Sequence, residues 1–402
     1  MNIVISRRGF LKSAAVVSSI GLAPEFLIRS VAHAATPIEG FKDDRILVVV
    51  QLSGGNDGLN TVVPHTDDAY YRARPRIGLK KDRLLTLTDD IALNDKLAPF
   101  KGLYDQGKLA LIQGVGYPNP DRSHFRSMEI WHTASDSDQF LGHGWIGRYF
   151  DNCCSGTARP QAGLALGKER PQAFDGTRGL GIACENPTTF GWKEGNGADK
   201  LTSFQAVNAA EATSNTTLDF LRHVTHDAIM SAGEVRKAAE QSGAKRGESP
   251  LQTVASLIKG GLATRIYYVS VGGFDTHAGQ LGRQDNLLDR VAKSIGDFQA
   301  TLERDGTADR VVTMVFSEFG RRVGENASAG TDHGTAAPMF LVGNRVKAGI
   351  HGVAPSLTDL DEGDLKYTTD FRSVYAGVLE NWFEVDSASV LQQKIPPIGI
   401  IA

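Results

Sequence analysis

Five apolar runs rich in β-branched residues do most to restrict how this 402-residue chain can fold. A strand with one wet face alternates apolar and polar residues, whereas a strand buried on both faces of a parallel sheet is continuously apolar. The continuous runs therefore predict buried strands of one sheet. They cover residues 46–52, 109–115, 265–271, 310–316 and 337–343.

Helical patterns separate or follow these runs. Residues 96–108 precede the second run, and residues 286–306 lie between the third and the fourth and end at Gly306. Residues 368–383 carry an apolar face behind a Thr or Asp cap. Alternation of helices and strands predicts an α/β fold, in which a mostly parallel central sheet has helices on both faces.

The middle of the chain follows a different pattern. It begins with a glycine-rich irregular stretch and continues into a long polar helical stretch over 208–243. We predict that residues 155–250 are an insertion or cap on a single domain formed by residues 35–402, placed over the face that binds the ligand.

The N-terminus has the features of a twin-arginine export signal. The motif SRRGFLK (6–12) precedes a moderately apolar stretch and a small-residue cleavage site, which predicts cleavage after Ala34. The alternative is a retained membrane anchor, but Pro24 and Glu25 interrupt an already short apolar stretch. We therefore expect residues 1–34 to be removed by way of the twin-arginine translocase. The mature protein would then be periplasmic or extracellular, without a stable membrane anchor.

The charge balance argues against one class of partner. Of the 43 basic and 46 acidic residues, four and one lie within 1–34, so the remaining chain carries 39 against 45, a net charge of −6. A mildly acidic chain lacks the broad basic surface that binds nucleic acid.

The three cysteines match no zinc motif, and Cys184 could pair with Cys153 or with Cys154 in an oxidising compartment.

Side chains that bind metals or anions follow four of the five runs. Ligands of open α/β sheets bind at the carboxyl ends of the strands, so these residues are candidates for one shared site. Each alone is more simply explained as a turn or helix-cap residue, but their recurrence at four strand ends favours a site. The candidates are Asp57 after the first run, Arg122, Ser123 and His124 after the second, Asp275 and His277 after the third, and Glu318, Arg321, Asp332 and His333 after the fourth.

This mixture of side chains suits metal-assisted chemistry on an anion. Carboxylates with imidazoles suit zinc or manganese, and carboxylate-rich sites also suit magnesium or calcium. A serine at a helix N-terminus beside a metal is a candidate nucleophile, and arginines bind oxyanions with two hydrogen bonds. The predicted substrate is an anionic small molecule or polymer.

The same segments resemble an exported bacterial family, domain of unknown function 1501, which is grouped with the alkaline phosphatase and sulfatase superfamily. The resemblance covers nearly the whole mature chain. It implies an alkaline phosphatase-like α/β/α sandwich. The motifs that carry it are VVVQLSGGNDGLNTVVP, PDRSHFRSMEIWHTA, GGFDTHAGQ, FSEFGRRVGENASAGTDHGTAAPMFLVG and DFRSVYAGVLENWF.

The resemblance also implies roles for individual residues. Asp57 stands where the superfamily has a metal-binding Asp, and Ser123 matches the nucleophile at the start of a helix. Asp275 and His277 resemble the ligands of a first metal. The superfamily completes a second metal site with an Asp–His pair, but here Glu318 and Phe319 occupy those positions.

This departure leaves two hypotheses. His333, in the later TDHG motif, could supply the missing ligand, with Asp332 as a ligand or as a partner of a histidine. The first hypothesis is a metal-dependent hydrolase of phosphate or sulfate esters, in which Ser123 attacks while Arg122 and Arg321 stabilise the oxyanion. The metal would be held by Asp57, Asp275, His277, Glu318 and His333. The second is a non-catalytic exported binding or scaffold protein, because a shared fold does not fix activity.

Overall fold

The computed structural model describes residues 41–153, 159–191 and 216–402. The predicted export signal, residues 1–34, lies outside the described residues. Within the described ranges, no helix is both long and apolar enough to span a bilayer. Cys153 and Cys184 form no disulfide with each other, and Cys154 lies outside the described residues.

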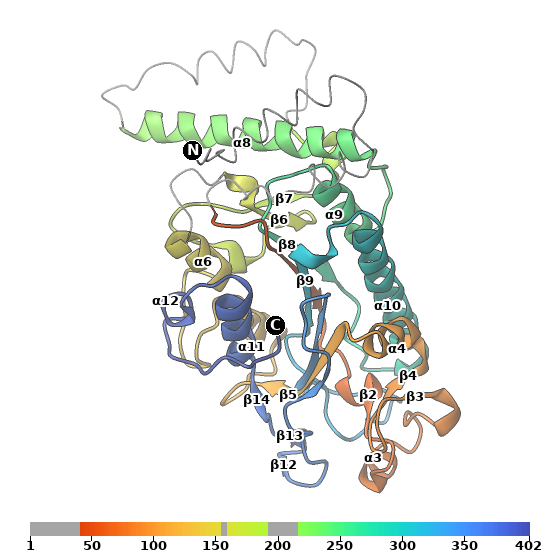
Figure 1. Ribbon diagram of the computed structural model, residues 1–402. Helices are drawn as coiled ribbons and strands as arrows, with labels where there is room; N and C mark the ends of the chain where they lie inside the picture. The colour runs from red at the N-terminus through yellow and green to blue at the C-terminus, as the bar shows by residue number, and fades with distance from the viewer. Residues whose placement is uncertain (1–40, 154–158, 192–215) are drawn as a thin grey trace, which may run out of the picture.

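A nine-stranded mixed sheet forms the centre of the protein (Figure 1). Its strand order is β11-β5-β10-β9-β1-β8-β6-β7, with β14 also paired to β5. All five predicted strands are confirmed to within about one residue at each end. The strands are β1 (Ile46–Leu52), β5 (Leu109–Gly116), β6 (Gly163–Leu166), β7 (Ile182–Cys184), β8 (Ile266–Val271), β9 (Val311–Phe316), β10 (Ala337–Val342), β11 (Gly349–His351) and β14 (Thr369–Asp370).

The sheet is parallel except around β10. Strand β1 pairs in parallel with β8 on one side and with β9 on the other. Strand β10 lies antiparallel between β9 and β5. The carboxyl ends of β1, β8 and β9 therefore meet at one edge of the sheet, and β5 points to the same edge because two antiparallel steps restore its direction.

Both faces of β1 are buried, as a continuous apolar run predicts. Ile46, Val48 and Val50 belong to a hydrophobic cluster with helices α4 (Ala98–Asp105), α9 (Pro250–Lys259) and α10 (Gln280–Arg304). Leu47 and Val49 belong to a second cluster on the opposite face. That cluster includes α5 (His124–Thr133), α6 (Trp145–Cys153), α11 (Phe371–Gly377) and α12 (Ser387–Leu391).

The two helical layers lie on opposite sides of the sheet, with α4, α9 and α10 on one side and α6, α11 and α12 on the other (Figure 1). This arrangement confirms the predicted α/β sandwich. The expected helix over 368–383 is also present. Asp370 caps α11 through a hydrogen bond from the amide of Arg372, and a π-helical turn, Val378–Trp382, extends it.

Part of the region predicted as an insertion contributes to the sheet. Strands β6 and β7 lie within 155–250 and pair in parallel with β8 and with each other. Helix α8 (Thr216–Ser242) then packs against α9. The other short elements are β2 (Val62–Val63), α3 (Asp68–Ala73), β3 (Leu84–Thr86), β4 (Ala92–Asn94), β12 (Leu360–Asp361) and β13 (Asp364–Leu365).

Candidate metal centre

The loops that follow β1, β8 and β9 meet at the carboxyl edge of the sheet. The amide of Phe274, after β8, donates to the carbonyl of Ser53, after β1, at 3.2 Å. The amide of Gly54 donates to Oε1 of Glu318, directly after β9, at 2.7 Å. Asp275 is the next residue after Phe274, so the three loops place Asp275 and Glu318 at one point.

The loop after β9 folds back on itself and brings His333 to the same point. Arg321 and His333 form an antiparallel β-bridge. The amide of Arg322 also donates to the carbonyl of Asp332 at 3.1 Å. This fold-back explains how the TDHG motif, well beyond the end of the strand, reaches the edge at which Glu318 lies.

His124 reaches the site from the first turn of α5. Its Nδ1 lies 2.8 Å from Oε1 of Glu318, whose side chain is completely buried. Its Nε2 is buried and has no hydrogen-bond partner among the described residues. A buried ring nitrogen without a partner is costly, and a bound cation would satisfy it.

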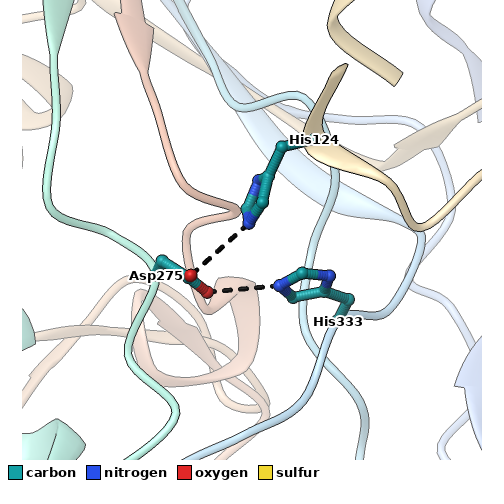
Figure 2. Close-up of side chains that lie close together, drawn as sticks. All are labelled: His124, Asp275 and His333. Atoms are coloured by element: carbon teal, nitrogen blue, oxygen red, sulfur yellow. Dashed lines mark hydrogen bonds and ion pairs between the residues drawn. The ribbon is translucent and has the colours of Figure 1, made fainter. Parts of the chain in front are cut away.

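The carboxylate of Asp275 is directed towards the rings of both His124 and His333 (Figure 2). Its Oδ2 is 3.6 Å from Nε2 of His124, and its Oδ1 is 3.2 Å from Nε2 of His333. His277 lies close to the same pair, with Nε2 2.9 Å from Oδ1 of Asp275 and 3.0 Å from Nε2 of His333.

These separations fit a common ion. Tetrahedral zinc with bonds of about 2.0–2.1 Å places its ligand atoms about 3.3–3.4 Å apart. The three atoms contributed by Asp275, His277 and His333 are separated by 2.9–3.2 Å. The atoms contributed by His124, Asp275 and His333 all lie within 4.8 Å of one another. Small side-chain adjustments would bring either triplet onto one cation.

An oxygen acceptor orients each of the three imidazoles. The Nδ1 of His124 faces Glu318, that of His277 faces Oδ1 of Asp332 at 3.2 Å, and that of His333 faces the carbonyl of Arg122 at 2.8 Å. An acceptor at Nδ1 keeps the proton of a neutral ring on that nitrogen, so the lone pair of Nε2 faces the cluster. Histidines that bind metals are commonly fixed in this way.

The electrostatics favour an ionised carboxylate next to titratable imidazoles. Partial burial raises the pKa of Asp275, but the hydrogen bond and charge of Arg321 outweigh it and lower the pKa to about 2. The hydrogen bond to Glu318 raises the pKa of His124. Burial lowers the pKa of His333, which favours the neutral ring. Protons and a metal would therefore compete for His124.

The guanidinium of Arg321 binds groups of the protein itself and does not point into solvent. Its side chain is fully buried and donates to Oδ1 of Asp275 at 2.6 Å. It also donates to four backbone carbonyls from three loops, those of Gly54, Gly55, Phe274 and Thr331. A guanidinium used in this way holds the loops and the carboxylate together, and it does not face a substrate.

The carboxylate of Asp57 is likewise paired with groups of the protein. It forms a fully buried ion pair with Arg74, whose NH1 lies 2.6 Å from its Oδ2. Gln280 donates to the same oxygen, and the amide of Leu59 donates to Oδ1 at 3.2 Å. Asp57 therefore has a cationic partner within the protein, and the structure does not group it with Asp275.

Ser123 and Arg122 border the site. Ser123 is exposed at the N-cap position of α5, and its side chain makes no capping hydrogen bond. The backbone carbonyl of Arg122 accepts a hydrogen bond from Nδ1 of His333, as above. Its guanidinium is partly exposed and lies 2.6 Å from Oδ2 of the buried Asp364.

The sequence placed His124 among the side chains that follow the second run, but it did not assign His124 a role as a metal ligand. Its position at a helix start, next to the predicted nucleophile, was the signal that could have indicated one. Phe319 packs against the site, since its ring centroid lies 4.9 Å from the ring centroid of His124 and 4.9 Å from that of His333. It fills the space beside two of the imidazoles, at the position where the resemblance implied a histidine.

Comparison with known families identifies the chain. The profile of "Protein of unknown function (DUF1501)" matches residues 111–395. The chain belongs to this family. No curated protein matches the sequence.

The solved structures to which the chain is similar are distant in sequence. The chain is similar to the lipoteichoic acid synthase LtaP from Listeria monocytogenes, with 8% identity, a TM-score of 0.36, and coverage of 87% of this chain and 76% of that one. It is also similar to a protein in the alkaline phosphatase superfamily from Vibrio parahaemolyticus, with 9% identity, a TM-score of 0.37, and coverage of 90% and 72%. A third is the C-terminal periplasmic domain of EcEptC from Escherichia coli in complex with Zn, with 10% identity, a TM-score of 0.36, and coverage of 77% and 78%.

Proposed function

We propose that this DUF1501 protein binds one divalent cation through Asp275, His277 and His333, with His124 as a fourth ligand. The observation that supports this proposal is the convergence of three imidazole Nε2 atoms on one carboxylate, with an oxygen acceptor behind each ring. Glu318 and Asp332, which the sequence suggested as ligands, act as these acceptors and orient His124 and His277.

The donor set favours a zinc-type ion. Imidazole ligands suit zinc and neighbouring transition metals, whereas magnesium and calcium prefer oxygen ligands throughout. Two contacts oppose a second ion. Arg74 already neutralises Asp57, and the apolar ring of Phe319 lies against His124 and His333. We therefore propose a single metal.

The proposed reaction is hydrolysis of a phosphate or sulfate ester. A bound zinc-type ion supplies Lewis acidity at the oxygens of such an ester. Ser123 is the proposed nucleophile, because its exposed hydroxyl precedes a ligand and does not cap α5. Arg122, which is partly exposed, is the proposed oxyanion contact. Arg321 positions Asp275 and takes no part in binding the ester.

One observation favours the second hypothesis, a non-catalytic binding or scaffold protein. Four candidate ligands are enough to close a tetrahedral shell, and closed zinc sites are structural, whereas catalytic sites keep a position open. Whether His124 is a ligand in the loaded protein therefore separates the two hypotheses.

The deciding experiment combines metal analysis with turnover. We expect the purified protein to hold about one equivalent of metal by elemental analysis, and to hydrolyse an aryl phosphate, an aryl phosphodiester or an aryl sulfate. Ser123→Ala should keep the metal and lose at least about 100-fold in turnover, as expected for a lost nucleophile. The control is Ser389→Ala, an exposed serine on α12. Metal without turnover would favour the binding protein, and failure to load metal would reject both the site and the hydrolase.

We further propose that residues 1–34 direct export by the twin-arginine pathway. The support is the paired arginines, the apolar stretch and the small-residue cleavage site. This route transports folded proteins, which suits a chain that acquires its metal before export.

A further inference from the structure

A cavity of about 350 Å³ lies beside the metal centre. Two residues connect it to the site. Glu318 lines the cavity and holds His124 through its carboxylate. Phe319 also lines it, and the same ring packs against His124 and His333. A ligand in this cavity would therefore contact Glu318 and Phe319, and each of these side chains directly contacts at least one of the histidines proposed as metal ligands.

Aromatic rings and a few polar groups form the walls of the cavity. Tyr117, Trp131, Phe319 and Tyr367 contribute rings, and Asn119 and Thr335 contribute polar side chains. Tyr367 is 38% exposed, so its ring is available at the mouth. Walls of this composition, and a volume at the lower end of the range for small-molecule sites, are typical of pockets that bind ligands.

Trp131 carries a hydrogen-bond donor that the protein does not use. The side chain is 1% exposed, and its Nε1–H has no partner among the described residues. Its ring is stacked against Phe316 at 4.8 Å and against Phe371 at 4.4 Å between centroids. Because two stacked rings hold the buried indole, it cannot turn to find another acceptor. An orphaned buried donor calls for an acceptor supplied from outside the protein.

The charged residues of the cavity do not attract an anion. Glu318 and Asp361 are acidic, and the ammonium group of Lys366 lies 2.5 Å from Oδ1 of Asp359. The anionic part of a substrate would instead lie at the metal, and the cavity suits a neutral group with an apolar face and oxygen acceptors.

We propose that this cavity binds a neutral pyranose unit, the sugar that carries the ester. A pyranose has an apolar face that stacks on aromatic rings and ring and hydroxyl oxygens that accept hydrogen bonds, here from Trp131. The inference deepens the proposed function and rests on it for the role of the cavity. Binding of the unesterified sugar, however, needs neither metal nor turnover.

The test is binding of methyl β-D-glucopyranoside, methyl β-D-galactopyranoside and N-acetylglucosamine to the intact protein, by saturation-transfer NMR and titration calorimetry. Cyclohexanol is the apolar control, and each titration is done with zinc and with EDTA. We expect at least one sugar to bind in both buffers and cyclohexanol to bind more weakly.

Two variants test the location of the site. Trp131→Phe keeps the ring and removes the N–H, and it should weaken sugar binding about 2- to 10-fold, the value of one hydrogen bond. Tyr367→Ala changes an exposed side chain, so it should fold normally and weaken binding too. Trp145→Phe removes an indole N–H from another core tryptophan, outside the cavity lining, and should have no effect.

The outcomes separate this inference from the proposed function. Absence of binding by all three sugars, or binding that Trp131→Phe and Tyr367→Ala leave unchanged, overturns the sugar site even if the enzyme hydrolyses aryl esters. Sugar binding that both variants weaken supports the site even if no ester is turned over, in which case the hydrolase proposal alone fails.

Discussion

Glu318 accepts hydrogen bonds from the amide of Gly54 and from Nδ1 of His124, and its side chain is completely buried. The sequence suggested that it binds metal directly. Its observed contacts suit a different role, since they fix the ring of His124 and link the loop after β1 to the loop after β9. A carboxylate behind a metal-binding imidazole orients the ring and increases its basicity.

Replacement of this carboxylate should weaken metal binding without removing a ligand. We expect Glu318→Gln to lower zinc affinity about 10- to 100-fold, the range for such supporting groups, measured by competition with a chelator. The control is Glu325→Gln, which changes a glutamate that pairs with Arg76 and has no contact with the three imidazoles. Equal affinities in the two variants would contradict the role of Glu318.

His132 makes folding stability depend on pH. Burial lowers the pKa of His132 to about 4, and its Nε2 lies 3.1 Å from the hydroxyl of Tyr268. The unfolded chain has the ordinary histidine pKa of about 6.5, so it binds more protons than the folded chain between pH 6.5 and 4. The stabilising contribution is therefore complete above pH 6.5 and is lost as the pH falls towards 4.

The size of this effect can be measured by denaturant unfolding. Between pH 7 and pH 5 the free energy of unfolding should fall by about 2 kcal/mol because of His132 alone. His132→Gln keeps a hydrogen-bonding group but cannot titrate. In this variant the decrease in unfolding free energy between pH 7 and pH 5 should be smaller by about 2 kcal/mol. An identical pH dependence in the two proteins would show that His132 is not responsible.

At the level of elements, the site depends on how closely three loops approach one another. Gly54 has a φ of +117°, and a Cβ at this position would lie 2.5 Å from the amide nitrogen of Asp275. The loop after β1 and the loop after β8 can touch only because this residue has no side chain. The β-bridge between Arg321 and His333 then closes the third loop over them.

Gly54→Ala should therefore disturb both the fold and the metal site. We expect a loss of at least about 3 kcal/mol in unfolding free energy, from backbone strain together with the clash, and impaired metal loading. Gly107→Ala is the matched control, because Gly107 also has a positive φ, +73°, but open space where the Cβ would lie. It should cost about 1–2 kcal/mol. Similar losses in the two variants would mean that the contact with Asp275 has no special importance.

At the scale of the whole molecule, the candidate ligands come from three separate segments distributed over residues 124–333. His124 begins α5, Asp275 and His277 follow β8, and His333 precedes β10. The ligand set therefore exists only in the folded chain. Folding and metal loading before transport would suit the proposed export.

The export proposal rests on the paired arginines Arg7 and Arg8. Replacement of Arg7 and Arg8 by lysine keeps the charge of the motif, and we expect it to block export and leave the folded, metal-loaded protein inside the cytoplasmic membrane. Fractionation and immunoblotting measure the distribution, with Lys12→Arg as the control. Normal export of the double variant would argue for a different route.

The sequence determined the sheet and the edge at which the site lies. Continuous apolar runs have few alternatives to buried strands, because no other short element hides both faces. Polar residues placed directly after those runs had to lie at the carboxyl edge. The strands, the helical layers and the position of Asp275 and Glu318 at that edge follow from local pattern and from the direction of the strands.

Only the tertiary structure decided the role of each side chain. Asp57 and Asp275 both follow a strand, yet Asp57 meets Arg74, and Asp275 meets three imidazoles. Arg321 likewise turns inward to backbone carbonyls. A sequence pattern specifies which groups reach an edge. Which charge pairs with which depends on side-chain contacts between loops that are distant along the chain, and those contacts exist only once the loops have packed together.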